Sequence, residues 1–313
     1  MRQLGLALLG FAAACGGAPA TTSSVAGSSP PASATTTPAS GVSATTICAV
    51  GGPAAGGPVS DPNGPYYHQV VLATSVDGVT LSGARVVIDH ASVPDVVRLP
   101  DGSQRLYYVD GTSGAIGSAR VDGDTVTTLG PLTMNGVRGP SGMADPDAVL
   151  LADGRIRLYY LNNFGTPGNG AVRGMCWADS TDGERFTTGG LAIQFSNAES
   201  VTDPSVARLP SGGWLMAASR GNTSLIARSP DGASFSGEES VPYGGVPELE
   251  VLPDGRVRLY VCAAGIVSYL SADQARTWTR EATVVAPGAL GAKVACDPSR
   301  AASANRFVFK IQP

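Results

Sequence analysis

Hydrophobic and polar residues alternate in short runs along most of the chain beyond residue 65, and the runs end at turn-forming residues. The clearest unit is residues 145–160. It opens with Asp145-Pro146-Asp147, continues as an apolar strand to a turn at Asp153-Gly154, and returns as a second strand that ends in two tyrosines. This pattern predicts a β-hairpin with acidic residues at its start.

Weaker copies of this hairpin recur, and they align on Pro94, Pro146, Pro204, Pro247 and Pro298. The prolines lie 52, 58, 43 and 51 residues apart. A second series of turns, mostly of the form Ser-x-Asp-Gly, falls between them at Asp77, Asp122, Asp182, Asp231 and Asp273. Two hairpins per repeat predict an all-β, five-bladed β-propeller with four-stranded blades. The first hairpin (66–89) and the last (297–311) would complete one blade from the two ends of the folded region.

The composition fits an all-β chain with many tight turns. Hydrophobic residues make up 43%, charged residues 15%, and there are 41 glycines and 23 prolines. The net charge is −4, and only two of the 21 basic residues are lysines, Lys293 and Lys310. Binding to nucleic acid is not expected, because it requires a basic surface.

The N-terminal region predicts export. An apolar run follows Met1-Arg2 and ends in Leu9-Gly10-Phe11-Ala12-Ala13-Ala14-Cys15, which resembles a bacterial lipoprotein signal with Cys15 as the lipidated residue. An ordinary secretory signal cleaved at Ala12–Ala14 is the alternative. Residues 16–46 contain almost only Ala, Ser, Thr, Pro and Gly, and therefore predict a disordered tether. The propeller is expected over residues 47–313, with the lipid anchor as its one contact with a membrane in the cell envelope.

The acidic residues beside the five prolines are the candidate functional residues. The inner strands of a propeller surround its axis, so the starts of these strands should converge on one mouth. The acids expected there are Asp95, Asp145, Asp147, Asp203, Glu248 and Asp297. Mutual repulsion raises the pKa of such groups, as acid–base chemistry at a glycosidic bond requires.

This arrangement resembles the five-bladed glycosidases of the arabinanase, β-xylosidase and invertase types. The resemblance implies that Asp145 is the base or nucleophile and Glu248 the acid. Asp203 would be a second aspartate with a tuning and positioning role. Two departures stand out, because Glu248 follows its proline and Val93 occupies the position where the family usually carries its first Asp. The further substrate-binding candidates are Asp95, Asp147, Asn163, Phe164, Arg220 and Asp297. The turn Asp61-Pro62 also resembles the invertase nucleophile motif, but it precedes an outer strand.

Ser271-Ala272-Asp273-Gln274-Ala275-Arg276-Thr277-Trp278 resembles the Asp-box of sialidases, with Ala275 in place of Gly. The resemblance implies that Asp77, Asp182, Asp231 and Asp273 are structural turn residues away from the active face. An exo-sialidase-like activity is an alternative function, and it would need an arginine cluster for the substrate carboxylate.

A further alternative is a non-catalytic propeller that binds carbohydrate or protein, with a calcium ion held by the acids. No cofactor is required by either the hydrolytic or the binding function, and the chain is expected to be a monomer.

The four cysteines that remain after Cys15 form an even set in an exported chain, so disulfides are expected. Three pairings are open to Cys48, Cys176, Cys262 and Cys296. The favoured pair is Cys262 with Cys296, because both should lie at the mouth end of neighbouring blades. Cys48 would then pair with Cys176 and fix the end of the tether to the second blade.

Overall fold

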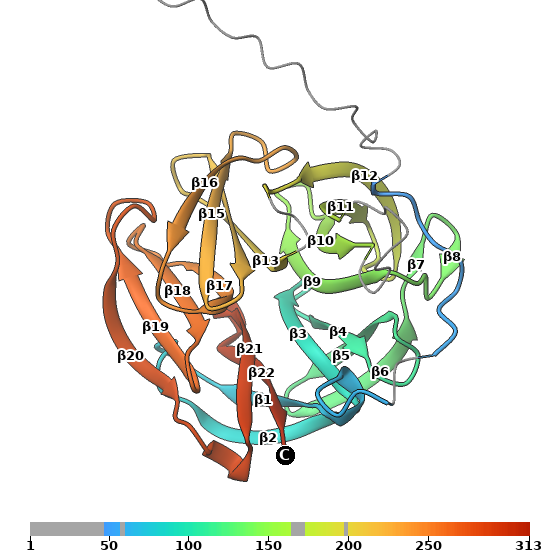
Figure 1. The fold of residues 1–313 in the computed structure, drawn as a ribbon, viewed down its shortest axis with the longest axis horizontal. Coiled ribbons are helices and arrows are strands. Elements are labelled where there is room, and N and C mark those ends of the chain that lie inside the picture. The colour runs from blue at the N-terminus through green and yellow to red at the C-terminus, as the bar shows by residue number, and fades with distance from the viewer. Residues whose placement is uncertain (1–46, 57–59, 164–172, 197–199) are drawn as a thin grey trace, which may run out of the picture. The chain divides into compact units, whose positions relative to one another are not determined.

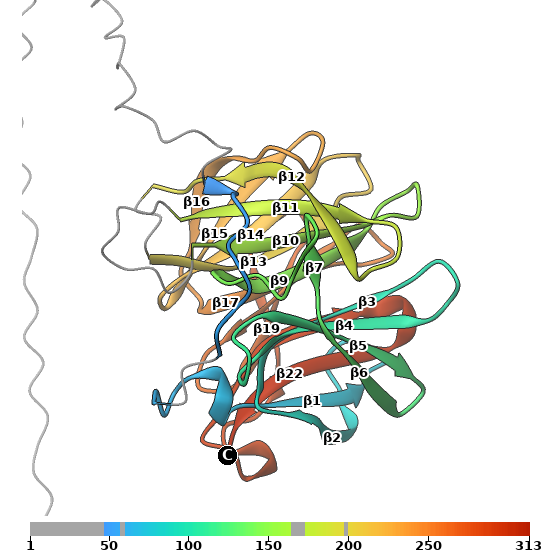
Figure 2. The same ribbon diagram turned by 90° about the vertical axis from the view of Figure 1, so that its right-hand side faces the viewer.

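The computed structural model describes residues 47–56, 60–163, 173–196 and 200–313. The chain divides into two compact units, residues 1–41 and 42–313, and the described residues all belong to the second. Five antiparallel sheets of this unit surround one axis, as Figure 1 shows in a view along it and Figure 2 from the side. The predicted five-bladed propeller is confirmed. The expected signal, the tether and Phe164 lie outside the described residues.

The blades are numbered in chain order, and each begins with its inner strand. Blade 1 contains β3 (Ala91–Arg98), β4 (Gln104–Asp110), β5 (Ile116–Asp122) and β6 (Thr125–Pro131). Blade 2 contains β9 (Met143–Leu150), β10 (Ile156–Asn162), β11 (Gly174–Ser180) and β12 (Arg185–Ile193), and β12 also pairs with a short hairpin, β7 (Thr133–Met134) and β8 (Val137–Arg138). Blade 3 contains β13 (Val201–Arg208), β14 (Trp214–Arg220), β15 (Thr223–Ser229) and β16 (Ser236–Val241). Blade 4 contains β17 (Gly245–Val251), β18 (Val257–Cys262), β19 (Ile266–Ser271) and β20 (Thr279–Val285).

Blade 5 is assembled from both ends of the unit, as the order of hairpins predicts. Its inner strands are β21 (Val294–Ala301) and β22 (Arg306–Gln312), and its outer strands are β1 (Gln69–Thr74) and β2 (Ser82–Asp89). β1 pairs with β22 along its whole length, from Gln69 opposite Ile311 to Thr74 opposite Arg306. This pairing closes the circle of blades. Short 3-10 turns cover Pro65–Tyr67, Ala289–Gly291 and Ala302–Ala304.

The hydrophobic core lies between neighbouring blades, where five clusters of buried side chains fill the junctions. Three junctions carry the same additional contact. A buried tyrosine on the second strand of one blade donates a hydrogen bond to the glycine carbonyl in the outer turn of the next blade. The pairs are Tyr107 with Gly183 (3.0 Å), Tyr159 with Gly232 (2.5 Å) and Tyr260 with Gly78 (2.9 Å). Each pair fixes the angle between two blades.

The segment from Ile47 to Gly56 is held against blade 2. Cys48 forms a disulfide with Cys176, and the Asn162 amide donates to the carbonyl groups of Ile47 (2.5 Å) and Ala49 (3.1 Å). The second disulfide joins Cys262 and Cys296, so both favoured pairings are confirmed. Two disulfides are typical of an exported chain. Within the described ranges, no helix is long and apolar enough to span a membrane.

Candidate functional site

All five inner strands carry the same distortion at the mouth. The residue before each aligned proline has a positive φ, between 48° and 52°, although none of the five is glycine: Val93, Asp145, Asp203, Val246 and Asp297. The pairing register with the second strand shifts at this point in each blade. These are β-bulges with strained backbone, a combination often found near functional sites. Because of the bulge, residues on both sides of four of the prolines line the axial cavity, and at Pro204 the lining includes Asp203 but not Ser205.

The residues after the prolines form one ring, here called the second ring: Asp95, Asp147, Ser205, Glu248 and Ser299. Each side chain accepts a hydrogen bond from the backbone N–H of the next blade, two residues beyond that blade's proline. The five donors, in the same order, are Ala148 (2.8 Å), Val206 (3.0 Å), Leu249 (2.9 Å), Arg300 (3.0 Å) and Val96 (3.1 Å). The circle of hydrogen bonds is complete, so the second ring joins all five blades at the axis.

The residues before the prolines form the first ring, which lies nearer to the mouth: Val93, Asp145, Asp203, Val246 and Asp297. Here the circle is incomplete. Asp145 accepts from the Asp203 N–H (3.1 Å) and Asp297 from the Val93 N–H (3.3 Å), whereas the Asp203 carboxylate accepts from the hydroxyl group of its neighbour Thr202 (2.5 Å). Asp203 is partly exposed, while Asp145 and Asp297 are buried. Asp203 is therefore the most accessible acid of the first ring.

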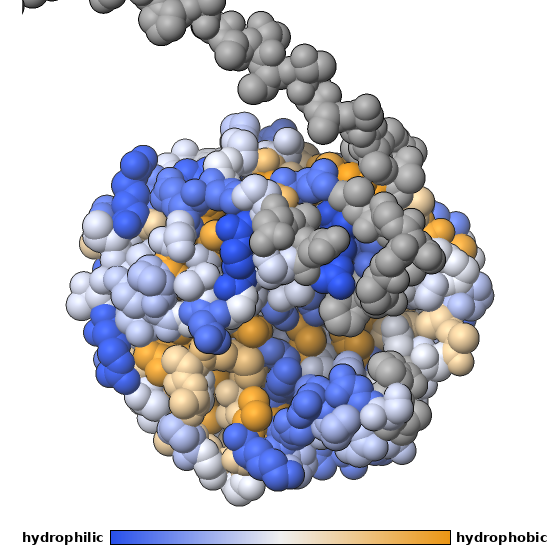
Figure 3. Space-filling model, viewed as in Figure 1, coloured by the Kyte–Doolittle hydropathy of each residue, from blue (hydrophilic) through white to orange (hydrophobic). Residues whose placement is uncertain are grey.

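The two rings enclose a cavity of about 20 Å³. This is room for about one water molecule or ion. A sugar ring is too large to enter this cavity. Figure 3 shows the molecule from this side, with hydrophobic residues (orange) and hydrophilic residues (blue) side by side near the axis.

Three residues that were not predicted for the site form a chain of contacts at Asp297 of the first ring. The Lys310 ammonium group lies 3.0 Å from Asp297 Oδ2. Ser92 Oγ donates a long hydrogen bond to the same oxygen (3.5 Å) and lies 2.9 Å from His68 Nδ1. His68 and Ser92 are both buried. Lys310 could have been noticed because it is one of two lysines among 21 basic residues, but nothing near it in the sequence places it beside Asp297.

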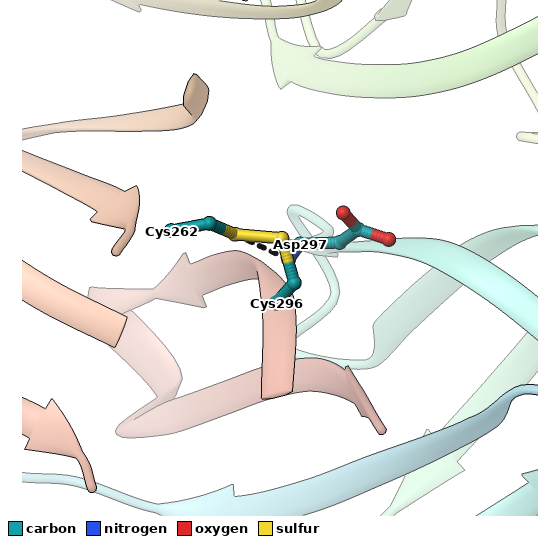
Figure 4. A group of neighbouring side chains, drawn as sticks. All are labelled: Cys262, Cys296 and Asp297. Atoms are coloured by element: carbon teal, nitrogen blue, oxygen red, sulfur yellow. Dashed lines mark hydrogen bonds between the residues drawn. A yellow bond between two sulfur atoms is a disulfide. The ribbon is translucent and has the colours of Figure 1, made fainter. Parts of the chain in front are cut away.

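The Cys262–Cys296 disulfide lies directly next to Asp297 of the first ring. Asp297 follows Cys296 directly, and its N–H donates to Cys262 Sγ (3.3 Å). Figure 4 shows the Asp297 carboxylate pointing away from the two sulfur atoms. The disulfide thus holds the strained backbone of Asp297 while the carboxylate remains directed toward the ring. Because both cysteines are oxidised, this trio does not offer thiolate ligands to a metal.

Burial perturbs the acids of both rings. In the first ring, burial raises the pKa of Asp145 to about 6. Burial, together with the charges of Asp145 and Asp297, raises the pKa of Asp203 well above its usual value. Burial alone would lower the pKa of Lys310, but the Asp297 carboxylate outweighs it and raises that pKa. The two neighbouring carboxyl groups therefore differ in environment, because the charges of two first-ring acids raise the pKa of Asp203, whereas the hydrogen bond from the Asp203 N–H opposes the rise in the pKa of Asp145.

The second ring contains the one cluster of carboxyl groups among the described residues that could hold a metal ion. Oxygen atoms of Asp95, Asp147 and Glu248 lie within 4.8 Å of one another, and all three residues are buried. Burial raises the pKa of Asp95 to about 6 and, together with the charge of Asp95, raises that of Glu248 to about 8. Such a cluster must take up either protons or a cation. Oxygen ligands of this kind suit calcium.

The predicted catalytic residues line one cavity but occupy two tiers. Asp145 and Asp203 belong to the first ring, whereas Glu248 belongs to the second. Both Glu248 oxygens are engaged, Oε1 by the Arg300 N–H (3.0 Å) and Oε2 by the Ser205 hydroxyl (2.7 Å). Of the predicted binding residues, Asp297 lies in the first ring, and Asp95 and Asp147 lie in the second.

Other predicted residues lie away from the rings or have structural partners. The Asn163 amide donates to the Ile47 carbonyl (3.3 Å), and Arg220 donates to the Ser196 carbonyl (2.5 Å) and pairs with Glu238 (3.3 Å). Asp61 accepts from the Asn63 N–H (2.9 Å) in a turn before blade 5. The predicted turn aspartates behave alike, and the backbone N–H groups of Thr80 and Val79 lower the pKa of Asp77 to about 2.

No protein-family model and no curated protein matches the sequence. The fold is shared with solved structures of low identity. A protein of unknown function from Dyadobacter fermentans is 18% identical, with a TM-score of 0.54 over 80% of this chain and 84% of that chain. An N-acetylgalactosamine deacetylase from F. plautii, in complex with blood group B trisaccharide, is 15% identical, with a TM-score of 0.52 over 71% and 77%. An alpha-L-arabinofuranosidase from Podospora anserina, in complex with cellotriose, is 13% identical, with a TM-score of 0.51 over 74% and 82%. At these identities the comparisons show a common fold.

Proposed function

We propose that this chain is an exported glycoside hydrolase whose acid and base lie in the first ring. The observation that carries the proposal is the pair Asp145 and Asp203, two neighbouring carboxyl groups at the mouth with unequal environments. Hydrolysis of a glycosidic bond needs one carboxylic acid to protonate the leaving oxygen and one carboxylate to act as base or nucleophile. The solved structures that share the fold include a carbohydrate-bound arabinofuranosidase, which supports a carbohydrate as the ligand.

The roles follow from the contacts. Asp203 is the proton donor, because it is partly exposed and its pKa is raised well above the usual value, which favours the protonated form. Asp145 is the carboxylate that acts as base or nucleophile. Glu248, the acid implied by the resemblance, uses both oxygens within the second ring. In this proposal it supports the site by joining blades 3, 4 and 5.

A hydrolysis screen of residues 46–313 tests the proposal. The substrates are aryl arabinofuranosides, xylosides, galactosides, fructosides and sialosides, which also cover the sialidase-like alternative. Asp203→Asn should lower turnover by at least about a hundredfold, the usual effect of removing a general acid. The matched control is Asp124→Asn, because that side chain is 79% exposed. Turnover by the Asp203→Asn protein at the wild-type rate would refute the assigned role.

A non-catalytic binding propeller with a bound calcium ion is the second candidate function. It is supported by the three carboxyl groups of the second ring, whose oxygens lie within 4.8 Å of one another. Calcium would replace the protons of Asp95, Asp147 and Glu248 and join three blades at the axis. A rise in melting temperature on adding calcium to the EDTA-treated protein, absent in Glu248→Gln, is the expected result. No turnover on any sugar, together with this rise, would favour the second candidate.

The proposed place of action is the outer side of the cell envelope, with Cys15 as the lipidated residue and residues 16–46 as the tether. The support for anchoring is the N-terminal sequence, and the two disulfides support export. Cys15→Ser should move the protein from the detergent phase to the aqueous phase in a Triton X-114 partition of cell extracts. An unchanged partition would refute lipidation.

A further inference from the structure

Three aromatic rings form a cluster on the mouth side of the propeller. Two of them come from the segment that precedes blade 5, and the third comes from the residue just before blade 1. The Tyr66 and His90 rings are parallel, with centroids 4.1 Å apart and planes 16° apart. Tyr67 meets Tyr66 edge to face, with centroids 5.4 Å apart, and is 44% exposed. We call Tyr66, Tyr67 and His90 the aromatic ledge. The segment that carries the two tyrosines is the blue turn before β1 in Figure 1.

The ledge is held rigidly by backbone contacts. His90 has a positive φ of 53°, and its Nδ1 donates to the Tyr66 carbonyl (2.5 Å). The Gly111 N–H donates to the His90 carbonyl (2.7 Å). Any side chain at Gly111 would collide with the Tyr66 backbone, because a Cβ there would lie 2.4 Å from the Tyr66 nitrogen. The strained His90 and the close approach at Gly111 fix the rings before any ligand binds.

The ledge is continuous with the first ring. Tyr67 directly precedes His68, and the buried His68 ring lies 2.9 Å from Ser92 Oγ. Ser92 in turn donates to Asp297 Oδ2 (3.5 Å). Two buried residues, His68 and Ser92, therefore connect the exposed Tyr67 to Asp297 of the first ring.

We propose that Tyr67, held by Tyr66 and His90, is the stacking surface of a sugar-binding subsite next to the first ring. This inference rests on the proposed function. A sugar ring has one apolar face of C–H groups and a rim of hydroxyl groups. An aromatic ring that is fixed in place and partly exposed binds such a face at little entropic cost. The ligand class is a neutral sugar unit in an oligosaccharide.

Calorimetric titration tests the subsite in the Asp203→Asn protein, where turnover is blocked. The probes are arabino-, xylo-, galacto- and fructo-oligosaccharides. Tyr67→Ala should weaken binding about tenfold, which corresponds to the stacking energy of one aromatic pair. Tyr67→Phe, which keeps the ring, should bind within twofold of its parent. Tyr243→Ala is the matched control, because Tyr243 is 36% exposed and stacks on Tyr269 at 4.4 Å, but lies in the connection between β16 and β17, outside the aromatic ledge.

The outcomes separate this inference from the proposed function. Weaker binding in Tyr67→Ala, with Tyr67→Phe and Tyr243→Ala unchanged, supports the subsite. Equal binding by Tyr67→Ala and its parent overturns the subsite and leaves the glycosidase proposal standing. Equal weakening by Tyr67→Ala and Tyr243→Ala also overturns it, because the loss would not be specific to the aromatic ledge. A protein that binds none of the oligosaccharides and hydrolyses no aryl glycoside overturns both.

Discussion

Glu248→Gln should make the protein more stable at pH 8 and reduce its gain in stability on acidification. Glu248 is 7% exposed and lies between blades 3 and 5, with its two oxygens bound by Ser205 and Arg300. Burial is the main cause that raises its pKa to about 8, and the charge of Asp95 adds to it. A neutral glutamine can occupy the same position, accepting from the Arg300 N–H through its carbonyl oxygen and donating to the Ser205 oxygen.

The sign and size of the expected change in the free energy of unfolding follow from the linkage between folding and proton binding. The folded-state pKa lies above the unfolded value, so the stability that the carboxyl group contributes is complete below about pH 4.3 and is lost as the pH rises toward 8. A difference of three to four pKa units corresponds to roughly 4–5 kcal/mol at about 1.4 kcal/mol per unit. Neighbouring Asp95 and Asp147 share the same protons, so roughly 2–5 kcal/mol is the expected range at pH 8. Glutamine is neutral throughout and avoids this loss.

Urea unfolding at pH 5, 6, 7 and 8 in EDTA measures the effect. Wild type should lose stability from pH 5 to pH 8, and Glu248→Gln should lose less and exceed wild type at pH 8. Glu239→Gln is the control, because that side chain is 52% exposed. A wild-type protein that gains stability from pH 5 to pH 8 would refute the reasoning. So would a Glu248→Gln protein that is less stable than wild type by the same amount at every pH.

Two further predictions concern the scaffold. Gly183→Ala should lower the free energy of unfolding by about 2–3 kcal/mol, because φ is 74° and the new Cβ would lie 2.9 Å from Ile156 and 3.0 Å from the Tyr107 hydroxyl oxygen. Gly123→Ala, with φ of 55° but open space around the Cβ, should cost about 1 kcal/mol, and equal losses in the two urea titrations would contradict this account. Replacing Cys262 and Cys296 by serine should cost about 4 kcal/mol, because the disulfide closes a loop with a sequence separation of 34 residues. An unchanged urea midpoint in the double variant would show that the disulfide does not support the first ring.

The sequence was sufficient to predict the propeller, its closure and the favoured disulfides, because each depends on the order and spacing of short patterns. The division of the acids into two rings was not predictable in this way. It depends on the bulge before each proline, where five non-glycine residues adopt a positive φ and, except at Ser205, both flanking residues line the axial cavity. One signal was available: the residue after each aligned proline is Asp, Asp, Ser, Glu or Ser, always a hydrogen-bond acceptor. Lys310 was not predictable, since it reaches Asp297 from the neighbouring strand β22.

One departure from the repeat has a structural reason that only the packing shows. Blades 2, 3 and 5 carry glycine in the outer turn, and each of these glycines faces a tyrosine hydroxyl of the preceding blade. Blade 4 carries Ala275 instead, with φ of 68°. The residue of blade 3 at the position of those tyrosines is Ala217, which pairs with Ser205 as Tyr107 pairs with Asp95. Without a tyrosine hydroxyl at that junction, the methyl group of Ala275 is accommodated and lies buried in the cluster that includes Ala217. The turn and the junction therefore vary together, because the same volume can be filled from either blade.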